Sequence, residues 1–201
     1  MKNNQCGRSM IEMLGVLAII AVLSVGGIAG YSKAMSMYKL NKWYDNLVQM
    51  ITNVQTAYIN QKSYGDSHKD LTSMFVSTGI IPKEILDKNN KDILGNTLNI
   101  FTSSVSATNG VFRINFYHKL PAGKEAVACC KKLYESSQYF PSMWAVDVTD
   151  FKYVVCGKAA PEIYRNYYNC QPYDLAKVAT ECIQCETKNC EMNFIFDNST
   201  F

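Results

Sequence analysis

The sequence predicts an α+β protein in which a long amino-terminal helix precedes an antiparallel β-sheet domain. Residues 10–31 are almost entirely apolar, and apolar residues then recur at helical spacing as far as Tyr58. From Thr97 onwards, apolar and polar residues alternate at the period of a strand. About 170 residues follow the apolar segment, which is enough for one core of ordinary size.

The apolar segment contains one charged side chain, Glu12, between Met10 and Tyr31. This segment forms about 33 Å of helix, which is long enough to cross a bilayer. A carboxylate at the centre of a bilayer costs roughly 2.5–3.5 kcal/mol on insertion scales, and less near an interface. Glu12 therefore either lies at the headgroups or requires a positively charged partner.

The helix is expected to continue beyond the apolar segment, because no Pro or Gly occurs from Ser32 to Gln61. Apolar side chains recur there at steps of three and four, at Tyr44, Leu47, Ile51, Val54 and Tyr58. The result is one helix over residues 8–62, roughly 80 Å long. Residues 8–31 are apolar all round, whereas the second half has one apolar stripe that the following domain should cover.

The globular part is expected to span residues 63–201 and to begin with short helical pieces. Turn-forming residues at Ser63–His68 end the long helix, and His68 is expected to be a solvated loop residue. Asp70–Phe75 predicts a short helix that Gly79 closes, and Pro82–Leu86 predicts another helical turn.

The remaining elements are predicted to be strands around one further helix. Thr97–Phe101 and Val111–Tyr117 alternate on either side of a turn-like segment, which is typical of an antiparallel hairpin. A helix follows over Pro121–Ser137, with Pro121 in its first turn. Three more strands are expected, at Trp144–Val148, Lys152–Cys156 and Met192–Phe196.

The cysteines indicate an oxidising compartment. Cys6 lies near the amino terminus, and the other seven all lie in the carboxyl-terminal half. Seven is an odd number, so at least one thiol stays free or pairs between chains, and leaving one out allows 7 × 15 = 105 arrangements. Cys129 and Cys130 point about 100° apart on a helix and should contact different neighbours. We expect disulfides among Cys130, Cys156, Cys170, Cys182, Cys185 and Cys190.

Other chemistries find little support. Cys182 and Cys185 form a Cys-x-x-Cys, which in a cytosolic chain would suggest zinc or redox chemistry, but the second pair of a zinc ribbon is missing. His68 and His118 are the only histidines, and no nucleophile or phosphate-loop motif occurs, so we expect no enzyme, metal or cofactor. The net charge of +3 with 18% charged residues is too mild to indicate a nucleic-acid partner.

The amino terminus resembles the signature of type IV prepilins. In that family a short polar leader ends in Gly, the chain is cut there, and Glu is the fifth residue of the mature protein, ahead of an apolar helix. Gly7 matches the last leader residue, which makes residues 1–7 the leader, Arg8 the new amino terminus and Glu12 the fifth mature residue. The resemblance implies cleavage by a prepilin peptidase, methylation of the new terminus, and pairing of Glu12 with a neighbouring subunit's amine during assembly.

The globular part resembles that of the type IVb pilins. The similarity lies in the order of the elements and in an internal helix carrying Cys-x-x-Leu, from Cys130 to Leu133. In that group a cysteine of this helix is joined to one near the carboxyl terminus. The resemblance therefore implies a pilin-like roll in which Cys130 bonds to Cys182, Cys185 or Cys190.

These resemblances imply a structural subunit of a type IV pilus or a pilus-like filament. Its precursor would lie in the bacterial inner membrane, contact the pilus assembly machinery, and form a homo-oligomeric filament on the cell surface. Alternatives are a type II secretion pseudopilin, a minor pilin, or a membrane-anchored, disulfide-rich exported binding domain. The competing interpretation of the apolar segment is an ordinary secretory signal, with Gly27 and Ala29 as the small residues before the cut.

We predict that the mature protein begins at Arg8, because the Gly7 junction and the spacing to Glu12 occur together. Terminal sequencing or intact-mass analysis should show Arg8, with or without a methyl group, as the first residue. Gly7→Phe should leave an uncut precursor in the membrane, because the peptidase requires a small residue at the cut. Normal processing of that variant, or a terminus at Met1 or Gly30, would contradict the prediction.

Overall fold

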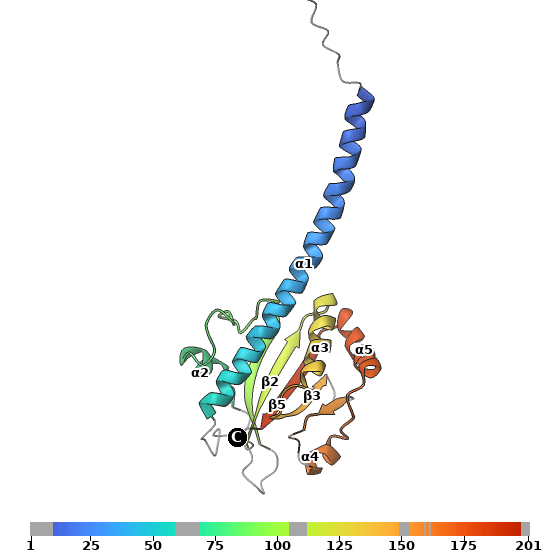
Figure 1. Cartoon of the computed structure of the whole chain (residues 1–201). Coiled ribbons are helices and arrows are strands. Elements are labelled where there is room, and N and C mark those ends of the chain that lie inside the picture. The colour runs from blue at the N-terminus through green and yellow to red at the C-terminus, as the bar shows by residue number, and fades with distance from the viewer. Residues whose placement is uncertain are drawn as a thin grey trace, which may run out of the picture. The chain divides into compact units, whose positions relative to one another are not determined.

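The computed structural model describes residues 10–58, 69–104, 112–148, 153–158, 160 and 162–197 (Figure 1). Its architecture is α+β, with a long apolar amino-terminal helix and an antiparallel five-stranded sheet. In chain order the elements are α1 (Met10–Tyr58), α2 (Thr72–Ser77), β1 (Thr97–Ser104), β2 (Phe112–Leu120), α3 (Lys124–Ser136), β3 (Met143–Val148), β4 (Val154–Cys156), α4 (Glu162–Tyr167), α5 (Leu175–Ile183), η1 (Gln184–Glu186) and β5 (Cys190–Asp197).

The chain divides into two compact units, and the division lies within α1, between Lys39 and Leu40. The second unit therefore includes the second half of α1, whose apolar stripe the following domain was expected to cover. Burial accounts for the position of this division. Every described residue before Leu40 is exposed, whereas Trp43 is 1% exposed and Leu47 is fully buried.

The buried stripe of α1 is centred on Leu47, Ile51 and Val54, which are all fully buried. Trp43 and Met50 complete it, because both lie on the same side of the helix. Tyr44, which the spacing also assigned to the stripe, is only partly buried. The stripe packs into the main hydrophobic core together with one face of the sheet, so the second half of α1 is a structural element of the globular unit.

The sheet has the strand order β1-β2-β5-β3-β4, and every neighbouring pair is antiparallel. Residues on one face alternate along each strand, as Ile114, Phe116 and Leu120 do on β2, and these face the main core. β5 lies between β2 and β3, although it is last in the sequence. The carboxyl-terminal segment thus completes the sheet at its centre.

Neighbouring loops occupy both edges of the sheet. Beside β1, the Leu71 amide donates to the Ile100 carbonyl at 2.8 Å. Beside β4, the Gln171 amide donates to the Val154 carbonyl, also at 2.8 Å. Edge strands with free backbone groups promote pairing between molecules, and these contacts reduce that tendency.

A helix lies near the predicted Pro121–Ser137 but begins later, at Lys124. Gly123 precedes it with φ of 153°, a conformation that favours glycine, and its amide donates to the Cys185 carbonyl at 2.9 Å. Pro121 therefore lies outside the helix. In Figure 1, α3 lies on the same side of the sheet as the second half of α1, and α5 lies beside α3.

The turn expected at Pro82–Leu86 is present, with the Ile85 amide donating to the Pro82 carbonyl at 3.0 Å. Other elements differ from the sequence-based expectation. The helices α4, α5 and η1 were not predicted. For α5 the signal was present, since the Asp174 carboxylate caps the helix by accepting from the Ala176 and Lys177 amides. His68 lies outside the described residues.

A smaller second core lies on the other face of the sheet. Trp144, Ala145 and Ile195 contribute to it from the strands, and Tyr164 contributes from α4. The rings of Trp144 and Tyr164 are 5.2 Å apart, centroid to centroid. Helix α4 thus covers part of the sheet face opposite α1.

Two titratable side chains are buried within the sheet. His118 is fully buried beside Trp43 and Phe194, and burial lowers its pKa to about 3, so the imidazole is neutral. Asp147 is 1% exposed, and its Oδ1 accepts from Asn193 Nδ2 at 3.1 Å, while its Oδ2 has no partner among the described residues. Burial raises the pKa of Asp147 to about 7, although the hydrogen bond from Asn193 opposes the rise.

We predict that stability falls between about pH 4 and pH 7, because the unfolded chain releases the Asp147 proton over this range while the folded chain retains it. A difference of about three pKa units corresponds to a loss of the order of 4 kcal/mol, with no further change above pH 7. Asp147→Asn should remove this slope and raise stability at neutral pH, as measured by denaturant unfolding. Asp45→Asn, at an exposed carboxylate, is the control, and an unchanged slope in Asp147→Asn would contradict the prediction.

Candidate functional site

The first part of α1, up to Lys39, is the most unusual surface of its unit. Within the described residues, α1 is the one helix long and apolar enough to cross a membrane by its length and composition, and its most apolar window has no buried residue. Large apolar side chains in this part are 53–82% exposed from Met10 to Ile28, including Leu14, Leu17, Ile20 and Leu23. A continuous exposed apolar surface of this kind is typical of helices that contact lipid or other helices.

Glu12 lies in the first turn of α1 and is exposed. Its carboxylate has no ion-pair partner within the described part of the chain. The amino-terminal end of a helix carries partial positive charge, which favours a carboxylate there. Gly7 and Arg8, the expected processing site, lie outside the described residues.

Glycines leave the surface of this part of α1 open. At Gly15, Gly26, Gly27 and Gly30 an added Cβ would meet no atom within 4 Å. The helix is continuous through all four positions. Such positions allow another helix backbone to approach closely, a feature of helix packing in lipid.

Three disulfides tie the carboxyl-terminal elements together. Cys130 of α3 is bonded to Cys182 of α5, one of the three partners that the resemblance implied, with Cα atoms 5.6 Å apart. Cys185 of η1 is bonded to Cys190 at the start of β5, across 5.4 Å. These two bonds fix α5 and η1 against α3 and the central strand, and both lie in the main core.

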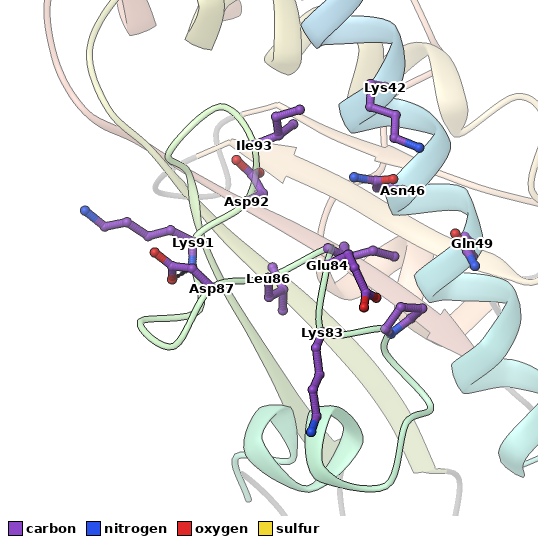
Figure 2. Close-up of a pocket in the computed structure, with 12 residues that line it drawn as sticks. Lys42, Asn46, Gln49, Lys83, Glu84, Leu86, Asp87, Lys91, Asp92 and Ile93 are labelled. Atoms are coloured by element: carbon purple, nitrogen blue, oxygen red, sulfur yellow. Dashed lines mark hydrogen bonds between the residues drawn. The ribbon is translucent and has the colours of Figure 1, made fainter.

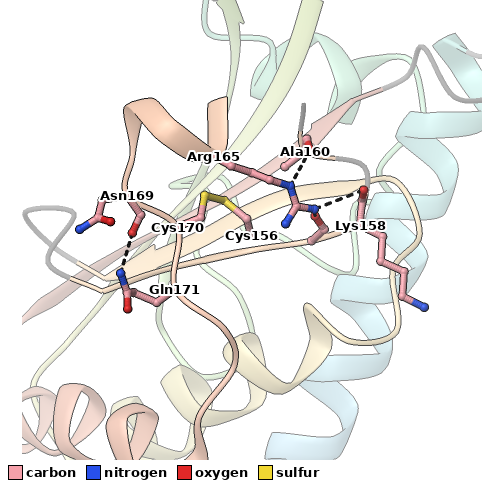
Figure 3. The surroundings of a disulfide bond; sticks show 8 residues. Cys156, Lys158, Ala160, Arg165, Asn169, Cys170 and Gln171 are labelled. Carbon is pink, nitrogen blue, oxygen red and sulfur yellow. Dashed lines mark hydrogen bonds between the residues drawn. A yellow bond between two sulfur atoms is a disulfide. The ribbon is translucent and has the colours of Figure 1, made fainter. Parts of the chain in front are cut away.

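The third disulfide joins Cys156 of β4 to Cys170, just after α4 (Figure 3). Beside it, Arg165 donates from Nε to the Ala160 carbonyl at 2.9 Å and from Nη2 to the Gly157 carbonyl at 2.7 Å. The disulfide and the guanidinium together hold α4 against the second core. The sequence had singled out the cysteines but not Arg165, since its carbonyl partners come from an irregular segment.

Cys129 is the free cysteine among those described, and it is buried. Asn96 Nδ2 lies 3.9 Å from its Sγ, and burial raises the pKa of the thiol well above its ordinary value. A buried neutral thiol is a poor nucleophile. Cys129 and its neighbour Cys130 contact different groups, as their angular separation on the helix predicts.

The Cys-x-x-Cys pair does not offer thiolates to a metal, because Cys182 and Cys185 belong to two different disulfides. No group of three or more His, Cys, Asp or Glu that could hold a metal occurs among the residues described. His118, one of the two histidines, is enclosed in the core and has no access to a substrate.

Comparison with protein-family models, with curated proteins and with solved structures found no match to this chain.

We predict that the disulfides stabilise the fold in the order of the loops they close. In the chain-entropy model, the separation of 52 residues between Cys130 and Cys182 corresponds to about 4 kcal/mol, and the separation of 5 between Cys185 and Cys190 to about 2 kcal/mol. The paired variants Cys130→Ala/Cys182→Ala and Cys185→Ala/Cys190→Ala should lose stability in that order in guanidinium unfolding under non-reducing conditions. Equal losses, or a Cys130 that reacts with thiol reagents in the folded protein, would contradict this.

Proposed function

We propose that the chain is the structural subunit of a type IV pilus or pilus-like filament. The single observation that supports this most is the exposed apolar surface of α1 up to Lys39, which begins with one carboxylate, Glu12. A helix of this kind suits two successive environments, the bilayer before assembly and the packed helices of a filament afterwards. Pseudopilins and minor pilins use the same mechanism, so the proposal includes them.

The proposed mechanism begins with removal of residues 1–7 by a prepilin peptidase at the inner membrane. The new amino terminus at Arg8 then carries a positive charge close to the apolar segment. In the filament, Glu12 of one copy pairs with the terminal amine of a neighbour. A carboxylate paired in this way is tolerable in an apolar environment, whereas an unpaired one is expensive, so the pair fixes the axial register of adjacent copies.

The globular unit would form the outer part of the filament. Its three disulfides support this part of the proposal, because such bonds form and persist in oxidising compartments outside the inner membrane. Long-range disulfides restrict the unfolded chain, and this favours a subunit that must withstand proteolysis and tension. The proposed precursor is an inner-membrane protein, and the proposed product is an extracellular filament.

We predict that Glu12→Ala inserts into the membrane at least as well as the unchanged chain but enters filaments poorly. The reason is that the substitution removes the intersubunit charge partner while leaving the fold of the globular unit intact. Membrane fractionation measures insertion, and the yield of sheared filaments measures assembly, which should drop at least tenfold. Asp45→Ala, which removes an exposed carboxylate elsewhere on α1, is the matched control.

Filament yield from Glu12→Ala equal to that of the control would remove the register role of the carboxylate. A membrane anchor without assembly predicts no filaments from either variant or from the unchanged chain. The same experiment therefore separates a filament subunit from an anchored binding domain.

A further inference from the structure

A cavity of about 500 Å³ lies within the second unit, between α1 and the segment Pro82–Ile93. Its volume falls in the range of about 300–1,000 Å³ typical of small-ligand sites. From α1 it is lined by Lys42, Asn46 and Gln49, and the opposite wall includes Glu84 (Figure 2). None of the functions discussed above uses this cavity.

Asn46 is the unusual residue of the cavity. It is only 7% exposed, yet its side chain forms no hydrogen bond with any residue that the structure describes. Figure 2 shows the Asn46 amide on the side of α1 that faces the cavity. Only a small part of Asn46 is open to solvent, at the cavity, and its neighbours Leu47 and Met50 are buried and apolar. The cavity is where a partner for this amide can enter.

The opposite wall is preformed. Ile81, Ile85 and Leu86 anchor it in the core, at no more than 5% exposure. Asp87 accepts from the Asn89 and Lys91 amides at 2.7 and 2.9 Å. A ligand would therefore meet an ordered wall and would not have to order a loop.

The acidic side chains of this wall differ in whether they already accept hydrogen bonds within the protein. Asp92 Oδ1 accepts from the Leu94 and Asn96 amides, and its Oδ2 accepts from Asn96 Nδ2. Asp87 Oδ1 also accepts hydrogen bonds, as described above. Glu84 is therefore the carboxylate on this wall without a hydrogen bond among the described residues. Figure 2 shows the ammonium groups of Lys83 and Lys91 directed away from the cavity.

The groups that remain available are two carboxamides, one carboxylate and the ammonium of Lys42. Their formal charges cancel, which does not favour a strongly anionic or cationic ligand. A carboxamide both donates and accepts hydrogen bonds, and a peptide group offers one donor and one acceptor. The cavity therefore matches the main chain of a peptide better than it matches a phosphate or a metal ion.

The chain itself contains an example of this recognition. Asn53 lies four residues beyond Gln49 on the same side of α1, and its Nδ2 donates to the main-chain carbonyl of Ile80 at 2.9 Å. Asn46, Gln49 and Asn53 thus form one row of carboxamides. At Asn53 the hydrogen-bonding partner is the chain's own backbone, whereas Asn46 and Gln49 line the cavity.

We propose that this cavity binds an extended peptide segment through its main chain, with Asn46 and Gln49 hydrogen-bonded to peptide groups and Lys42 and Glu84 flanking them. The segment is either a free short peptide or part of a neighbouring protein chain, because both present the same main-chain groups. The site lies wholly in the unit that begins at Leu40, so it is independent of the role of the apolar helix.

The test uses the full chain in detergent micelles and the neutral tripeptide N-acetyl-trialanine amide as the probe, with binding followed by calorimetry. The unchanged chain should bind the peptide saturably, and Asn46→Leu should weaken binding at least tenfold. Asn41→Leu, at an exposed amide of α1 that does not line the cavity, should leave binding unchanged. An analogue whose central amide is replaced by an ester should bind the unchanged chain more weakly, because it lacks one N–H donor.

A stability measurement separates this role from a structural one. Asn46→Leu should leave the unfolding temperature unchanged or raise it, because the amide has no hydrogen bond to a described residue that the substitution could remove, while it weakens peptide binding. A fall in unfolding temperature would show that Asn46 supports the fold through contacts of its own, and this would overturn the proposal. So would the absence of saturable binding to the unchanged chain, or equal binding by Asn46→Leu.

The source of the segment is decided by cross-linking in intact membranes. The photoreactive residue p-benzoylphenylalanine replaces Ile93, which lines the cavity and is 44% exposed. A product containing a second, differently tagged copy shows that a neighbouring chain supplies the segment, whereas adducts of peptide mass alone show a free peptide. The absence of any cross-linked product would count against the site.

Discussion

The structure depends on one constraint: a single helix must satisfy two different environments. As far as Tyr31, α1 presents apolar side chains on all sides, and the described residues before Leu40 are exposed. After Leu40 the apolar residues narrow to one stripe, and the core encloses Trp43, Leu47 and Ile51. The sheet face that packs against this stripe must itself be apolar and continuous. Strands β2, β5 and β3 lie side by side and form this face. The disulfides then act on elements that this packing has already brought together.

The central position of β5 makes the globular unit dependent on its last segment. β5 pairs with β2 on one side and β3 on the other, so the sheet is divided until the carboxyl-terminal residues are in place. Such long-range pairing costs loop-closure entropy, and Cys190 at the start of β5 is bonded to Cys185 only five residues away. The Cys130–Cys182 bond in turn links α3 to α5, which precedes η1 and β5. The two bonds fix the segment that leads into the central strand, and all four of their cysteines lie in the carboxyl-terminal half.

Local sequence patterns predicted most of the secondary structure. The arrangement of these elements in space depends on long-range contacts, which local patterns do not predict. The period of Leu47, Ile51 and Val54 identified the buried side of α1, and alternation located the strands, because both patterns reflect burial of one face. The position of β5 within the sheet and the partners of the cysteines are long-range facts, so the sequence left them open. The carbonyls that Arg165 binds and the cavity beside Asn46 depend on irregular segments, 157–160 and 82–93, which have no period to detect.

Three buried polar side chains of the globular unit have polar atoms without a hydrogen bond to a described residue, and their surroundings decide what each can do. His118 and Asp147 are enclosed by the sheet and its cores. A ligand cannot reach either side chain, so each affects the stability of the fold through its protonation state. For His118, burial favours the neutral imidazole, and for Asp147 it favours the protonated carboxyl, so both respond to pH and neither is placed to meet a ligand. Asn46 cannot titrate, and it faces a cavity instead of a closed core. A partner that enters the cavity can therefore form hydrogen bonds with this amide, which makes Asn46 the mostly buried polar side chain best placed to act in recognition.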